Sequence, residues 1–126
     1  MFYNPDYVFE GSVSYDYGVE AGRMIASKRE GITAVFATGD LVAFGVIAGL
    51  AEMGLKVPDD ISVIGFDDIS LAKMFVPRLT TIKQDITARG MIAAQSLLDA
   101  IEGKQEDSET LMMPIELVVR DTVRKI

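Results

Sequence analysis

The sequence predicts a single α/β domain, a Rossmann-like parallel sheet with helices on both faces. Short apolar, β-branched runs alternate with helical stretches of about ten to fifteen residues, an order typical of βαβ units. Of the 126 residues, 49% are hydrophobic, enough for the core that such a sheet needs. The same order implies right-handed crossovers between neighbouring parallel strands.

The first predicted element is a helix over residues 14–29. Its small and apolar side chains recur at helical spacing, and Ser14 or Asp16 is placed to serve as the N-cap. Gly31 follows, where a glycine in the left-handed conformation can end a helix.

A buried strand and a second helix come next. Residues 32–37, ITAVFA, form the short apolar run of a buried strand. After the TGD turn, Asp40 is positioned to cap a helix over residues 41–53. That helix is apolar almost all round, and the spacing of Gly45 and Gly49 favours close contact between helix and sheet.

The second half adds three strands and one long helix. Apolar runs predict strands at residues 61–66, 79–84 and 115–120. Residues 86–102 form a long helix with one stripe of small and apolar side chains, closed by Gly103.

Polar residues lie at the carboxyl ends of three of the predicted strands. They are Thr38–Asp40, then Asp67, then Lys83–Asp85. Because ligands of open α/β sheets bind outside the carboxyl ends of the strands, we expect these groups to share one rim.

Two side chains on this rim are candidate ligand contacts. The carboxylate of Asp67, at the end of ISVIGFDD, can accept charge-assisted hydrogen bonds from two hydroxyls, which favours a sugar over an apolar ligand. A loop cap is the alternative for Asp67, and it is the favoured role of Asp68. Gln84 offers a donor and an acceptor, and its alternative is a surface glutamine.

The composition excludes several classes of function. The formal charge is −7 and the 12 basic residues are scattered, which argues against binding a phosphate backbone. Histidine and cysteine are absent and no phosphate loop occurs, so we expect no catalytic residue, metal site or cofactor. No stretch approaches the roughly 18 apolar residues of a membrane span, and the start lacks a secretory signal. We therefore expect a cytoplasmic protein without a membrane partner.

Four stretches resemble the effector-binding core of LacI/GalR-family transcription regulators. The most specific are VPDDISVIGFDD and PRLTTIKQD; FEGSVSYDYGVEAG is similar to the opening of the second lobe, and MPIELVVRDT to the closing strand. The resemblance implies that residues 1–126 are the C-terminal lobe of a periplasmic-binding-protein-like core, which senses a small-molecule effector for a repressor. It also implies a helix-turn-helix headpiece and a first lobe, neither of which matches this chain, so DNA would be contacted only through the missing headpiece.

The resemblance also implies particular effector contacts. They fall at Asp67 and Gln84, and a third falls at Gly39, in TGD. Because glycine has no side-chain amide, both a sugar and a purine-like effector stay open. Val13, after EGS, stands where members often carry a large aromatic side chain against the sugar.

A homodimer is implied as well, through the second-lobe helix and the loop after GFDD. These place Leu41, Phe44, Ala48 and Phe75 in the interface, with core packing as the alternative for Phe75. The helix over residues 86–102 would pack on the first lobe. Without that lobe, we expect it to fold back on its own sheet or to pair with another copy.

Two other classes of protein stay open as alternatives. A fragment of a periplasmic sugar-binding protein of a transporter shares the fold, and a signal sequence upstream would identify it. An enzyme of flavodoxin-like architecture is disfavoured because histidine, cysteine and a phosphate loop are lacking.

Overall fold

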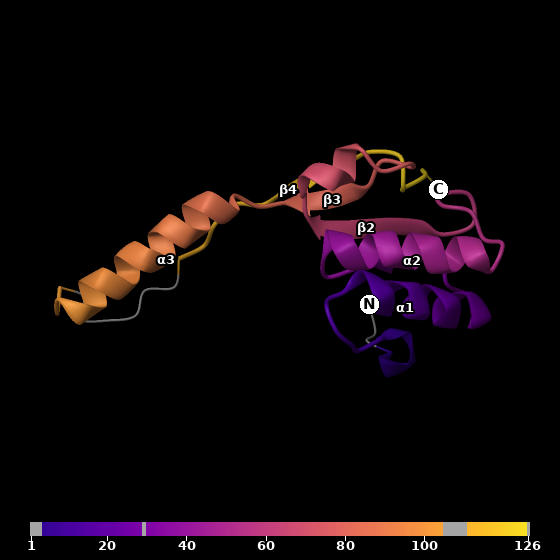
Figure 1. The fold of residues 1–126 in the computed structure, drawn as a ribbon, viewed down its shortest axis with the longest axis horizontal. Helices are drawn as coiled ribbons and strands as arrows, with labels where there is room; N and C mark the ends of the chain where they lie inside the picture. The colour runs from indigo at the N-terminus through magenta and orange to yellow at the C-terminus, as the bar shows by residue number, and fades with distance from the viewer. Residues whose placement is uncertain (1–3, 29, 105–110, 126) are drawn as a thin grey trace.

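A four-stranded sheet forms the centre of the computed structural model, which describes residues 4–28, 30–104 and 111–125 (Figure 1). The strand order is β1-β2-β3-β4, with β1 at Ala34–Phe36, β2 at Ser62–Asp67, β3 at Thr80–Lys83 and β4 at Glu116–Val118. The first three strands are parallel, so the predicted α/β class is confirmed. The last strand is antiparallel, because the chain returns at the end where β3 finished and pairs Glu116 with Lys83.

Two helices lie together on one side of the sheet (Figure 1). They are α1, Tyr15–Ser27, and α2, Asp40–Glu52; short 3-10 helices lie at Pro5–Tyr7 (η1) and Ser70–Lys73 (η2). Ser14 caps α1 as predicted, since its side chain accepts a hydrogen bond from the Tyr17 amide at 3.2 Å. The predicted cap of α2 is wrong: Gly39 occupies the N-cap, and the carboxylate of Asp40 contacts other elements.

Four glycines bring α1 and α2 into backbone contact. They are Gly18 and Gly22 on α1, facing Gly45 and Gly49 on α2. A methyl group added at Gly45 would lie 2.1 Å from the carbonyl oxygen of Tyr15, far inside van der Waals contact. The glycine spacing on α2 therefore serves a helix–helix contact, whereas the sequence favoured a helix–sheet contact.

Burial alternates along β2, so α2 covers one face of the sheet. Within the strand Val63 and Gly65 are buried, while Ile64 and Phe66 are only partly buried. On the opposite face the rings of Phe36 and Phe66 meet edge to face, 6.4 Å apart. The expectation of helices on both faces is thus met on one face among the described residues.

Helix α3, Ile86–Ile101, extends away from the sheet (Figure 1). Asp85 caps it by accepting a hydrogen bond from the Ala88 amide at 2.8 Å. None of its residues is buried, and its apolar side chains, including Leu97 and Ile101, are exposed. The expectation that this helix folds back on its own sheet is therefore wrong. No helix in the described ranges has the length and apolar character needed to cross a membrane.

Candidate functional site

The ends of β2 and β3 bring Asp67 and Gln84 together. Asp67 pairs in register with Lys83, so the next residue, Gln84, lies beside it at the carboxyl ends of the parallel strands. The Gln84 Nε2 group donates a hydrogen bond to Asp67 Oδ1 at 2.5 Å, and Arg89 on α3 donates to Gln84 Oε1. An open hollow of about 560 Å³ lies in front of them, lined by residues 67–70 and 83–87.

This arrangement can bind a ligand that donates hydrogen bonds. An ionised carboxylate offers about four lone-pair sites, so Asp67 can accept from Gln84 and from a ligand hydroxyl or amine together. Gln84 meanwhile orients the carboxylate, and Arg89 orients Gln84. Because the acceptor is charged, hydrogen bonds to it belong to the stronger class.

The backbone that carries Asp67 is strained. Asp67 has a φ of 108° and Asp68 a φ of 50°, both in the region that side chains other than glycine rarely adopt. Each such residue costs roughly 1–3 kcal/mol and persists only where its surroundings hold it in place. The turn of residues 67–69, called the rim turn below, is therefore held by contacts outside itself.

One of these contacts is an ion pair between Asp68 and Arg120. Asp68 Oδ1 lies 2.6 Å from Arg120 Nη2, and the two side chains are only 16% and 14% exposed. Arg120 also donates through Nη1 to the carbonyl oxygen of Leu79 at 2.8 Å. The carboxylate that we expected to cap the following loop is engaged in this ion pair instead.

Asp40 holds the rim turn from its other flank. Its side chain, in a residue only 1% exposed, accepts hydrogen bonds from Thr81 Oγ1 at 2.5 Å and from the Ile69 amide at 2.8 Å. Burial raises the pKa of Asp40, and these two hydrogen bonds act in the opposite direction. The nearby charges of Asp67 and Asp68 add to the rise.

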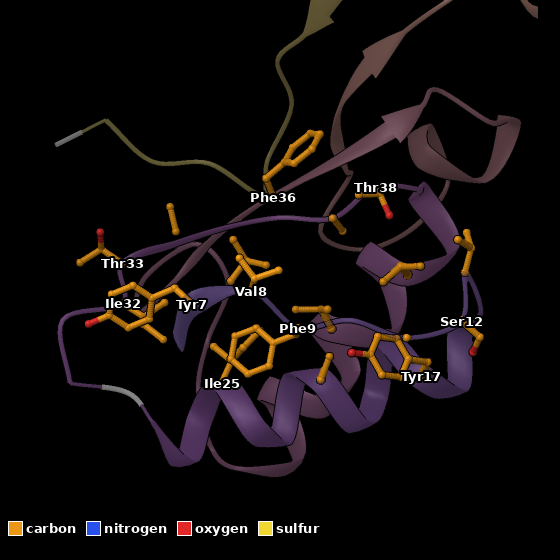
Figure 2. A pocket seen from close by; sticks show the side chains of 18 of the residues that line it. Tyr7, Val8, Phe9, Ser12, Tyr17, Ile25, Ile32, Thr33, Phe36 and Thr38 are labelled. Atoms are coloured by element: carbon orange, nitrogen blue, oxygen red, sulfur yellow. The ribbon is translucent and has the colours of Figure 1, made fainter. Parts of the chain in front are cut away.

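Val13 and Gly39 lie next to each other but not in the hollow of Asp67 and Gln84. A methyl group added at Gly39 would lie 3.4 Å from Val13 Cγ1. The exposed Val13 lines a second, more apolar groove of about 510 Å³. This groove lies between residues 7–13, β1 and the two helices (Figure 2). The structure thus brings the four predicted contacts together as two separate pairs.

The residues predicted at a dimer interface have different surroundings. Phe44 is 1% exposed, and its ring centroid lies 4.5 Å from that of the partly buried Phe75. Phe44 therefore belongs to the core, and its placement at an interface is wrong because its side chain is inaccessible. Leu41 is exposed and Ala48 partly exposed, so both stay predictions.

Several residues of this region were missed by sequence reasoning. The sequence contains no local pattern that indicates the roles of Arg120, Thr81 and Arg89, because their partners lie on other strands or on the rim turn. Asp40 was noticed, but its position before a helix favoured a cap. No group of three or more His, Cys, Asp or Glu side chains that could hold a metal occurs within the described part of the chain.

Comparison with known proteins identifies similar chains. A family model described as a periplasmic binding protein-like domain matches residues 3–123. The HTH-type transcriptional repressor PurR of Vibrio vulnificus is 45% identical over 98% of this chain, and that of Edwardsiella ictaluri is 43% identical over 93%. The chain spans 37% and 34% of the lengths of these relatives.

Solved structures of regulators share the fold. The transcriptional regulator CelR in complex with cellobiose superposes with a TM-score of 0.87 at 32% identity, covering 97% of this chain and 37% of that one. The lac repressor dimer bound to operator and the anti-inducer ONPF gives a TM-score of 0.80 at 33% identity, covering 90% and 40%.

Proposed function

The chain belongs to the periplasmic binding protein-like domain family, in the form found in LacI-type transcriptional regulators, and we propose that it supplies part of a repressor's effector site. The observation that carries the proposal is the Asp67–Gln84 pair at the carboxyl ends of two parallel strands, beside an open hollow. The repressor names of the relatives support this function over a transporter's periplasmic binding protein.

The effector is a small molecule with hydrogen-bond donors, either a sugar or a purine-like metabolite. Asp67 accepts from one or two of its donors, and Gln84 holds the carboxylate in position. The apolar Val13 lies beside Gly39, a position without a side chain, and both are outside the hollow of Asp67 and Gln84. Similar regulators have been solved with bound ribose, lactose and sucrose, which supports a hydroxyl-rich ligand.

The regulator responds by a shift in population. Its effector is held between this lobe and a facing lobe outside residues 1–126, and binding favours one angle between them. The angle sets the spacing of the DNA-binding headpieces in a cytoplasmic homodimer, to whose interface the exposed Leu41 and the partly exposed Ala48 contribute. This chain contacts the effector and leaves DNA contact to the headpiece.

The test is made in the full regulator that carries this chain. A thermal-shift panel of cellobiose, ribose, lactose, sucrose and purine bases selects a ligand, whose Kd is then measured by calorimetry. Asp67→Asn replaces charge-assisted hydrogen bonds by neutral ones, so we expect binding to weaken about tenfold or more. Asp59→Asn, an exposed aspartate that does not line the hollow, is the matched control and leaves Kd unchanged. Equal affinities of the wild type and Asp67→Asn would contradict the proposed function.

A further inference from the structure

We propose that Arg120 and Asp40 are positioning residues for effector binding, which hold the rim turn in the geometry that sets Asp67 against Gln84. The inference rests on the proposed function and adds two residues to it. Neither Arg120 nor Asp40 lines the hollow in front of Asp67 and Gln84. Any effect of these residues on a ligand there is therefore indirect, and the contacts below connect both residues to the rim turn.

The rim turn needs such support because of its backbone. Asp67 and Asp68 have consecutive positive φ angles without a glycine to relieve them. If the turn relaxed to negative φ, the peptide planes on both sides of Asp67 would rotate, and its side chain would leave the direction of Gln84. The Asp67–Gln84 hydrogen bond thus reports whether the turn is held.

Arg120 holds the turn through its planar guanidinium group. Its Nη2 pairs with Asp68 and its Nη1 donates to the carbonyl oxygen of Leu79, so the group ties the turn to the residue that leads into β3. The backbone of Arg120 is fixed as well, since its amide donates to Thr80 Oγ1 at 2.8 Å. A lysine would keep the charge but not the two-pronged geometry.

Asp40 ties the other side of the same turn to α2 and β3. Its carboxylate bridges the Ile69 amide and the Thr81 hydroxyl, and Thr81 Oγ1 also lies 3.4 Å from the Asp68 amide. The residues after Asp67 are thus held by a cation on one flank and by a buried carboxylate on the other. Both supports are well shielded from water, where hydrogen bonds to charged groups are strong.

A neighbouring ion pair supplies the matched control. Arg78 donates to both carboxylate oxygens of Asp121, at 2.7 and 3.0 Å, with the two side chains 60% and 42% exposed. This is the same chemistry close to Arg120 in the fold. In the described part of the chain, however, neither Arg78 nor Asp121 forms a side-chain hydrogen bond or ion pair with residues 67–69, and neither lines the hollow.

The test compares Arg120→Lys with Arg78→Lys in the full regulator. The first readout is ligand-free: the side-chain amide signal of Gln84 in a ¹H–¹⁵N NMR spectrum, which responds to its hydrogen bond with Asp67. We expect Arg120→Lys to move this signal toward the position of a solvated amide and Arg78→Lys to leave it in place. The second readout is the Kd for the compound, among cellobiose, ribose, lactose, sucrose and purine bases, that most stabilises the wild type. We expect Arg120→Lys to raise this Kd about tenfold.

A double-mutant cycle identifies the route of the effect. If Arg120 acts through Asp68, the effects of the two substitutions are not additive. The double variant that carries Arg120→Lys and Asp68→Asn should then bind the ligand no more weakly than whichever single variant binds it more weakly. Asp40→Asn, which supports the other flank, should move the Gln84 signal in the same direction. If Arg120→Lys does not fold, Asp68→Asn removes the same ion pair and takes its place in the Gln84 readout, which needs no ligand and is therefore unaffected by the position of Asp68 beside the hollow.

The outcomes separate this inference from the proposed function. An unchanged Gln84 signal in folded Arg120→Lys, or an equal change in Arg78→Lys, would overturn the positioning role whatever the protein binds. A wild type that binds none of the compounds, with a Gln84 signal that still moves in Arg120→Lys, would overturn the proposed function and leave the support of the rim turn established.

Discussion

Replacing Gly45 by alanine tests the backbone contact between α1 and α2. The new methyl carbon would lie 2.1 Å from the Tyr15 carbonyl oxygen and 2.8 Å from Gly18 Cα and the Val19 amide nitrogen. A carbon and an oxygen in ordinary contact are about 3.3 Å or more apart, so the helices must separate by on the order of 1 Å. All three obstacles are backbone atoms, which cannot move aside by changing a rotamer. Overpacking of a core typically costs about 1–3 kcal/mol. Because the backbone cannot move aside, we expect Gly45→Ala to lower the free energy of unfolding by about 3 kcal/mol or more.

The assay is urea denaturation followed by circular dichroism, with Gly90→Ala as the control. Gly90 lies in α3 with nothing within 4 Å of an added methyl group, so the same chemical change there meets open space. In a helix interior alanine is more favourable than glycine by about 1 kcal/mol. The urea midpoint of Gly90→Ala should therefore equal or exceed that of the wild type. A Gly45→Ala variant as stable as the wild type would show that the two helices are not in backbone contact.

Substitutions at two positions, Thr122 and Asp40, test the buried polar network. Thr122→Val removes a hydroxyl that accepts from the Thr80 amide at 2.8 Å and donates to the Val63 carbonyl at 2.7 Å, so we expect the free energy of unfolding to fall by about 2–4 kcal/mol. Thr122→Ser keeps both bonds and should lose about 1 kcal/mol in the same urea titration; equal losses would contradict this account. Asp40→Asn tests the raised pKa of Asp40. A raised pKa means that the folded chain binds the proton of the Asp40 carboxyl group more tightly than the unfolded chain does. The free energy of unfolding of the wild type, relative to that of Asp40→Asn, should therefore fall as the pH rises from below 3.8 through the raised pKa, and then level off. Urea titrations of both proteins at several pH values measure this difference in stability. A difference that rises with pH would contradict the raised pKa of Asp40.

Local signals in the sequence were enough to locate the helices and strands. Ser14 is the N-cap of α1 because a cap depends on the amide three residues later, which the sequence shows directly. Asp40 occupies a similar local pattern, but its partners Ile69 and Thr81 are 29 and 41 residues away along the chain. No spacing rule distinguishes a local cap from a distant partner, so the role of Asp40 required the fold.

The proximity of Asp67 and Gln84 was predictable from topology alone. Parallel strands that pair in register bring their carboxyl ends to one edge, and the sequence located both ends within a residue or two. The partner of Asp68 was not predictable in this way. Arg120 follows a strand whose antiparallel direction depends on where the chain returns after α3, and neither hydrophobic pattern nor charge pattern specifies that path.

Burial decides which of the two arginine–aspartate pairs near the rim matters. Arg78 and Asp121 have the better bidentate geometry, but both are largely exposed, and water competes for each group, so their pair adds little net stability. Arg120 and Asp68 make a single direct contact in surroundings where neither side chain is more than 16% exposed. Removing one partner there leaves the other charge poorly solvated, at a cost of about 3–5 kcal/mol. The turn can escape that cost only by carrying Asp68 out to water, which would also carry Asp67 away from Gln84.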